Sequence, residues 1–151
     1  MANELLHLNG SQVEVGSNST TIASNAGPTV VGSLAASQML SYPLGDFVLE
    51  AAAAAAVAGN GVIMLYQRRL NVDGTLDGLT PSGLVSYSHK LVGRFLFPYS
   101  SASHAANQIL TCDGVPLPAG DVEYYIDNNT NATIAGGWVL KVTPRTYQPG
   151  A

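Results

Sequence analysis

The three histidines are the first residues to consider for chemistry, because imidazole serves both as a metal ligand and as a general base. His7, His89 and His104 lie in unrelated contexts, without the HxH or HExxH spacing that brings two imidazoles to one metal. Cys112 is the only cysteine, so neither an intrachain disulfide nor a thiolate zinc site can form. We expect no metal and no cofactor, and an inert buried thiol on a strand.

The segment NVDGTLDG is a candidate for calcium binding. It places the oxygen-bearing Asn71, Asp73 and Asp77 close together, as in a calcium loop. The closing bidentate acid is missing at the required distance, and Asp–Gly pairs are common turn formers. A turn is therefore the favoured interpretation.

A second group of acidic residues lies near the C-terminal end. Glu123 and Asp127 are expected to share a strand face with Tyr125, and Asp121 precedes them. This spacing favours a solvated sheet edge over the acid–base pair of a glycosidase. The nucleophile elbow G-x-S-x-G is absent as well. The sequence therefore predicts that the protein is not an enzyme, and it disfavours cupin and glycosidase activities.

The composition favours contacts with other proteins. Only 11% of the residues are charged, against a usual share of about 25%, while the hydrophobic share is 46%. This apolar content argues against disorder, and a surface poor in charge is easily desolvated at an interface. The net charge is −4, and no nucleic-acid partner is expected because the basic residues are scattered: Arg68, Arg69, Lys90, Arg94, Lys141 and Arg145.

With 151 residues the chain has the size of one domain. Its start, MANELLHLNG, lacks the basic region and long apolar stretch of a secretory signal peptide. No run approaches about 18 apolar residues, so no contact with a membrane is expected.

Residues 1–43 differ from the rest, because they are rich in Ser, Asn, Gly and Ala and carry few charges. Short β-like pieces occur around Gln12–Val15, Thr20–Ala23 and Thr29–Leu34. The segment is expected to be an extended N-terminal arm or a set of marginal strands, laid over a neighbouring subunit. An irregular N-terminal part of the same domain is the alternative.

Residues 44–151 are expected to form the domain, since apolar residues recur there with the period of two that strands show. Turn signals such as NG, DG and PAG separate the strands. A shorter strand is expected at Gln108–Cys112. Four further strands are expected, each with one apolar face. The first face consists of Val62, Met64, Tyr66, Leu70 and Val72 and is interrupted by Arg68; the second of Leu91, Phe95, Phe97 and Tyr99; the third of Val122, Tyr124 and Ile126; and the fourth of Trp138, Leu140 and Val142.

The stretch Phe47–Val57 is ambiguous, because its alanine run Ala51–Ala56 scores as helix on propensity alone. Gly59–Asn60–Gly61 would stop a helix, but the same Asn–Gly pair also makes a tight hairpin turn into Val62–Val72. A strand is the favoured prediction. Together the strands predict an all-β fold, a single antiparallel β-sandwich that is jelly-roll-like.

Three residues are candidates for an interface. Tyr124 and Tyr125 must point to opposite faces of one strand, so one of them is expected to be exposed or at an interface. Arg68, Arg69 and Tyr125 interrupt or oppose the apolar faces and are therefore the predicted contact residues.

Three segments carry a resemblance to a known class of proteins. They are GVIMLYQRRLNVDGT, KLVGRFLF and VPLPAGDVEYYIDNNTNATIAGGWVLKVTPRTY. This series, which covers roughly residues 45 to 148, resembles the capsid decoration (cement) proteins of tailed bacteriophages. The N-terminal segment is not part of the resemblance.

The resemblance implies a virion protein on the capsid exterior, made in the host cytoplasm. Such a protein is an oligomer that binds the expanded head and bridges major capsid subunits, and a homotrimer is expected. The alternative is a virion-surface or tail-associated module that binds host polysaccharide through an exposed aromatic platform, to which Tyr87, Tyr125 or Tyr147 would contribute.

Overall fold

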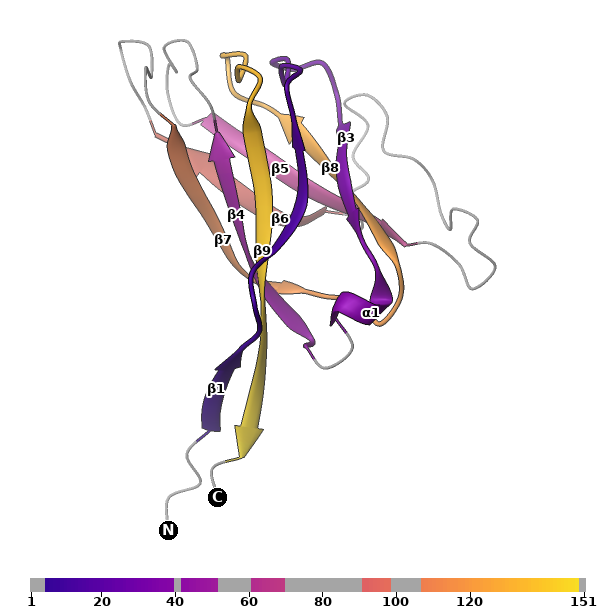
Figure 1. Cartoon of the computed structure of the whole chain (residues 1–151). Helices are drawn as coiled ribbons and strands as arrows, with labels where there is room; N and C mark the ends of the chain where they lie inside the picture. Colours follow the sequence, from indigo (N-terminus) through magenta and orange to yellow (C-terminus); the bar gives the residue numbers. More distant parts are fainter. Residues whose placement is uncertain (1–4, 40–41, 52–60, 70–90, 99–106, 150–151) are drawn as a thin grey trace.

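The structure is a computed structural model that describes residues 5–39, 42–51, 61–69, 91–98 and 107–149. Two antiparallel sheets pack face to face and a single short helix, α1, lies among the described residues (Figure 1). In chain order the elements are β1 (Leu5–Asn9), β2 (Val13–Asn18), β3 (Thr29–Leu34), α1 (Ala36–Met39), β4 (Leu44–Ala51), β5 (Gly61–Arg69), β6 (Leu91–Phe97), β7 (Gln108–Pro116), β8 (Val122–Asn128) and β9 (Trp138–Pro149).

The strand order is that of a jelly roll. One sheet has the order β1-β9-β4-β7, with β2 also paired to β9, and the other has the order β3-β8-β5-β6. The pairs β5 with β6, β4 with β7, β3 with β8 and β2 with β9 are nested one inside the next, as in a long hairpin rolled into two layers. The predicted all-β antiparallel sandwich is confirmed.

The core lies between the inner faces of the two sheets. Phe47 of β4 packs against Tyr124 of β8, with ring centroids 5.1 Å apart, and both side chains are fully buried. Trp138 is buried as well, and its indole Nε1 donates a hydrogen bond to the Thr20 carbonyl oxygen at 3.0 Å. The predicted inner faces of β8 and β9 are confirmed, as is that of β6 at Phe95 and Phe97.

Strand β5 has the opposite orientation to the one its apolar pattern indicates. Ile63 and Leu65 are its fully buried core residues. Val62 and Tyr66 belong to the other face, together with Arg68. Because both faces of β5 are apolar over most of its length, alternation alone did not identify the inner one.

The tight hairpin expected at Asn60–Gly61 is wrong, because β4 and β5 lie in different sheets. Strand β4 pairs with β7 and β9, whereas β5 pairs with β6 and β8. The strand expected over Phe47–Val57 is confirmed up to Ala51. The rest of the alanine run lies outside the described residues, as do Asn71–Gly78, His89 and His104.

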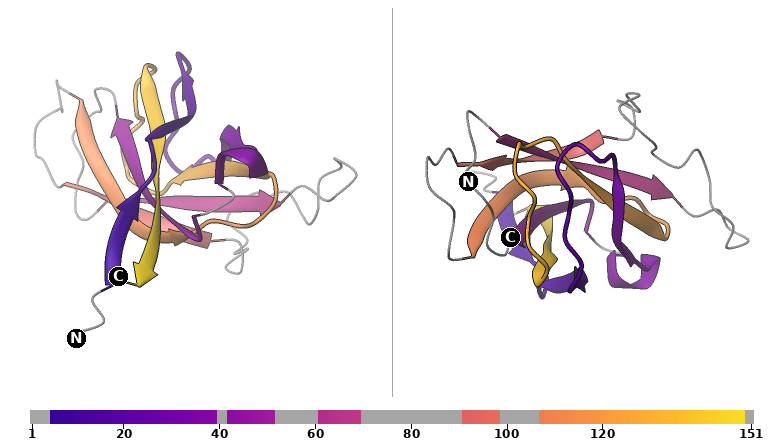
Figure 2. Two further views of the ribbon diagram at one scale, coloured as in Figure 1. Left: turned by 60° about the horizontal axis from the view of Figure 1, so that its bottom comes forward. Right: turned by 90° about the horizontal axis from the view of Figure 1, so that it is seen from above.

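The N-terminal segment supplies strands to both sheets. Two of its expected strands are present as β2 and β3, which pair with β9 and β8. Val15, Ile22, Val31 and Leu34 are buried in the common core. The part that extends away from the sandwich is β1 with the end of β9, which together form a projecting two-stranded ribbon (Figures 1 and 2).

The two sheets touch backbone to backbone where β2 and β3 meet. Each strand has a bulge there, next to Gly16 in β2 and Gly32 in β3. A Cβ atom at Gly16 would lie 1.9 Å from the Val31 carbonyl oxygen, and one at Gly32 would lie 1.9 Å from the Val15 carbonyl oxygen. Only glycine fits at both positions, so these residues close this corner of the sandwich.

We expect Gly16→Ala to lower the free energy of unfolding by about 3 kcal/mol, and Tm by roughly 6–12 °C, because the added methyl group forces the sheets apart. Gly120→Ala is the control, since the nearest atom to its added Cβ is an Arg69 nitrogen at 3.6 Å. Equal stability of the two variants in thermal unfolding would contradict the close packing of β2 on β3.

Candidate interaction face

The predicted contact residues Arg68 and Tyr125 lie on the outer face of the sheet β3-β8-β5-β6. Strand register defines this face, because residues directly opposite each other on neighbouring strands point to the same side. Tyr125 is opposite both Val30 and Tyr66, and Arg68 is opposite Glu123. The outer face comprises Val30, Ser33, Val62, Met64, Tyr66, Arg68, Arg94, Leu96, Glu123, Tyr125 and Asp127.

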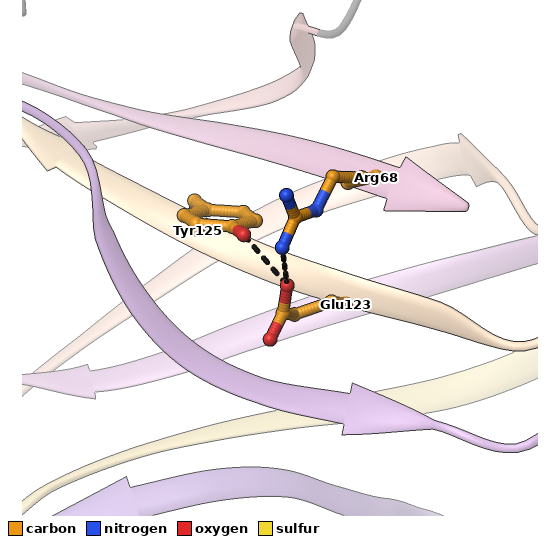
Figure 3. Close-up of polar contacts among 3 residues, drawn as sticks. All are labelled: Arg68, Glu123 and Tyr125. Carbon is orange, nitrogen blue, oxygen red and sulfur yellow. Dashed lines mark hydrogen bonds and ion pairs between the residues drawn. The ribbon is translucent and has the colours of Figure 1, made fainter. Parts of the chain in front are cut away.

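Glu123 links Arg68 and Tyr125 into one polar cluster (Figure 3). Its Oε2 atom accepts a hydrogen bond from Arg68 Nη2 at 2.7 Å and another from the Tyr125 hydroxyl at 2.6 Å. The Arg68 guanidinium also lies 5.5 Å from the centroid of the Tyr125 ring, within the range of a cation–π interaction. All three side chains are thus held in one arrangement.

The cluster shifts the ionisation of both acidic groups. The pKa of Glu123 is lower than usual. Burial is the largest single effect and acts to raise this pKa, but the hydrogen bonds from Tyr125 and Arg68 and the charge of Arg68 together outweigh it. Burial, followed by the hydrogen bond to Glu123, raises the pKa of Tyr125 to about 12. At neutral pH the cluster therefore consists of a carboxylate, a guanidinium and a protonated phenol.

A second polar group lies further along the same face. Asp127 is buried, and its Oδ2 atom accepts a hydrogen bond from the Asn129 amide at 3.1 Å. Burial raises the pKa of Asp127, with Asn129 opposing the shift. The Tyr66 hydroxyl donates to the Met64 sulfur at 3.3 Å, and burial together with the charge of Asp127 raises the pKa of Tyr66.

The exposed residues of this face are Val30, Ser33, Arg94 and Leu96, none of which is acidic. Leu96 is 70% exposed and lies on the edge strand β6 with the exposed Arg94, whereas Val30 is 49% exposed and lies on β3 at the opposite edge of the sheet. Tyrosine, methionine and arginine beside exposed aliphatic side chains are typical of protein–protein contacts, in which lysine and glutamate are depleted. This composition makes the outer face of β3-β8-β5-β6 the candidate interaction face.

The outer face of the other sheet has a different character. Lys141 pairs with Glu50 at 2.5 Å, and Arg145 pairs with Asp46 at 3.1 Å. Each of these side chains is partly exposed, as is usual for a solvated sheet surface. Ile109 is its one strongly exposed large hydrophobic residue among those described.

The structure brings two of the three predicted contact residues, Arg68 and Tyr125, together. Arg68 is 5% exposed, and Tyr124 and Tyr125 are 0% and 1% exposed, so neither tyrosine of the pair is exposed in the chain by itself. The Arg68 guanidinium lies over the Tyr125 ring, and both side chains donate a hydrogen bond to Glu123. The three side chains therefore hold one another in place. Arg69, at the end of β5, is exposed.

The solvated edge expected for Glu123 and Asp127 is wrong, because β8 is paired on both sides and Asp127 is 3% exposed. Glu123 accepts two hydrogen bonds, and its partner Arg68 is buried. The signal that identifies it is the register of β5 against β8, which places Arg68 opposite Glu123. That register depends on pairing between distant segments and was not available from local spacing.

Other expected chemical groups are placed as follows. Cys112 is a half-buried free thiol on β7, and burial raises its pKa. Trp138 is buried, Tyr147 is exposed on the ribbon, and Tyr87 lies outside the described residues. Among the described residues, no group of three His, Cys, Asp or Glu side chains is placed to hold a metal, and no helix is long and apolar enough to cross a membrane.

Comparisons with protein-family models, with curated proteins and with solved structures give no match. The class to which the chain belongs is therefore defined by its topology alone, an antiparallel jelly-roll sandwich.

We expect Glu123→Gln to lower the free energy of unfolding by about 2–3 kcal/mol, because it removes the negative charge that accepts a hydrogen bond from the buried Arg68 cation. The matched control is Glu50→Gln, which breaks a more exposed ion pair and should cost no more than about 0.5 kcal/mol. Denaturant unfolding of both variants measures the difference, and equal losses would contradict a structural role for the cluster.

The effect of Glu123→Gln should depend on pH. Because the pKa of Glu123 is lowered in the folded state, its stabilising effect is complete above its unfolded-state pKa of about 4.3. It is lost as the pH falls through the lower folded-state value. Wild type and variant should therefore converge in stability in acid, and a constant difference down to pH 2 would contradict this assignment.

Proposed function

We propose that this protein is a structural virion protein that binds the outer surface of a phage capsid and stabilises the expanded head by bridging major capsid subunits. The observation that supports this most is the candidate interaction face. It combines exposed Val30 and Leu96 on the edge strands β3 and β6 with a fixed Arg68–Glu123–Tyr125 cluster on the central strands β8 and β5. A jelly roll hosts several functions, so it is the face and not the fold that supports this function.

The physical character of the face suits a cement protein. Its polar groups are already ordered by their own hydrogen bonds, so binding costs little further loss of side-chain entropy. The low charge of the chain keeps the desolvation cost of a close contact small. Each contact can be weak, because many copies on a symmetric shell and the valency of a homo-oligomer multiply the effect.

The polysaccharide-binding alternative has less support. An aromatic platform requires exposed rings, but Trp138 and Tyr125 are buried. Among the described tyrosines, Tyr147 is exposed, and it lies on the projecting ribbon rather than on a sheet face.

Co-sedimentation with purified phage heads tests the proposal. The protein should bind saturably to expanded, DNA-free heads that lack it, bind less to unexpanded heads, and raise the resistance of the expanded heads to heat. Absence of binding to both forms would contradict the proposed function.

Two variants test the face itself. Leu96→Glu places a charge on the candidate interaction face and should weaken head binding at least about tenfold, which corresponds to about 1.4 kcal/mol. Ile109→Glu is the matched control, because Ile109 is 71% exposed but lies on the other sheet, and it should bind as the wild type does. Loss of binding in Ile109→Glu alone would assign the contact to the opposite sheet.

A further inference from the structure

Strand β1 forms an open sheet edge. Its five residues pair with the end of β9, which is the only described element with which β1 makes an extensive contact. The ribbon that the two strands form projects beyond the sandwich in both Figure 1 and the left view of Figure 2. A two-stranded ribbon that lacks a packing partner is at best marginally stable in water.

The register shows which backbone groups lie along this edge. Gly10 donates its backbone N–H to the Pro144 carbonyl oxygen at 2.8 Å, which makes Gly10 and Pro144 a hydrogen-bonded pair. Such pairs alternate with pairs whose backbone groups point away from the partner strand. Leu6 and Leu8 lie an even number of residues from Gly10, so their backbone groups point toward β9. The N–H and C=O groups of Leu5, His7 and Asn9 therefore point away from β9.

The edge carries none of the usual protection against strand addition. Natural edge strands are blocked by charged residues, proline or bulges, whereas β1 reads Leu-Leu-His-Leu-Asn and pairs with β9 without a register shift. Leu8 is 38% exposed. An edge of this kind is suited to receive another extended strand.

We propose that the open edge of β1 pairs antiparallel with the same edge of a second copy of this chain. A register centred on His7 places Leu5 of one copy opposite Asn9 of the other, so every outward backbone group meets an outward group, and about six hydrogen bonds can form. The strand has no acidic residue, lysine or arginine, so the two paired strands bring no like charges together at neutral pH.

This pairing relates two copies by a two-fold axis and therefore makes a dimer, in place of the trimer expected from the resemblance. This dimer rests on the homo-oligomer of the proposed function and assigns the interface between its subunits to the edge of β1. It is tested on the protein alone, without capsids, so its failure and the failure of head binding are distinguishable.

The experiment measures the mass of the full-length protein in solution by analytical ultracentrifugation. The wild type should sediment as a dimer of the 15.6 kDa chain. His7→Pro removes an outward N–H while leaving the bonds to β9 intact, and it should raise the dimer dissociation constant at least about tenfold. His7→Ala keeps that N–H and is the matched control.

Asn9→Pro and Asn9→Ala form a second pair at another outward position and should behave in the same way. Circular dichroism and thermal unfolding establish that the proline variants keep the jelly roll. A wild type that is monomeric or trimeric, or folded proline variants that dimerise as the wild type does, would overturn the proposal. Leu96→Glu should remain a dimer, which separates this contact from the capsid-binding face.

Discussion

The register of β5 against β8 is the constraint on which the core and the candidate interaction face both depend. It places Leu65 opposite Ile126 in the core and Arg68 opposite Glu123 on the outer face. Because side chains alternate along a strand, a slip of β5 by one residue would turn Arg68 toward the core, separate it from Glu123 and turn Ile63 and Leu65 outward. The cost of burying unmatched charge therefore helps to hold the same register that packs the core.

The sequence predicted the fold best where the two faces of a strand differ clearly in polarity. Val122, Tyr124 and Ile126 on β8 and Trp138, Leu140 and Val142 on β9 were identified as core residues for this reason. It failed at β5, whose faces are both apolar, and at Asn60–Gly61, where a local turn signal could not show that the flanking strands enter different sheets. Arg68 and Tyr125 could be singled out from local spacing, but Glu123 became recognisable as their partner only through the pairing of distant strands.

The two proposed contacts lie on different parts of the molecule and complement each other. The outer face of β3-β8-β5-β6 is a broad surface with exposed aliphatic side chains, whereas the β1 edge offers directional backbone hydrogen bonds. A two-fold dimer joined at β1 presents two such faces. Simultaneous binding of both faces to neighbouring capsid subunits would give the dimer a higher avidity than either single contact.

Electron cryomicroscopy of expanded heads saturated with the protein tests the central claim most directly. The account predicts density for jelly-roll domains on the outside of the shell, with the sheet β3-β8-β5-β6, and Leu96 in particular, turned toward the major capsid subunits. Domains attached through the sheet that carries Ile109, or heads without added density at saturating protein, would contradict it.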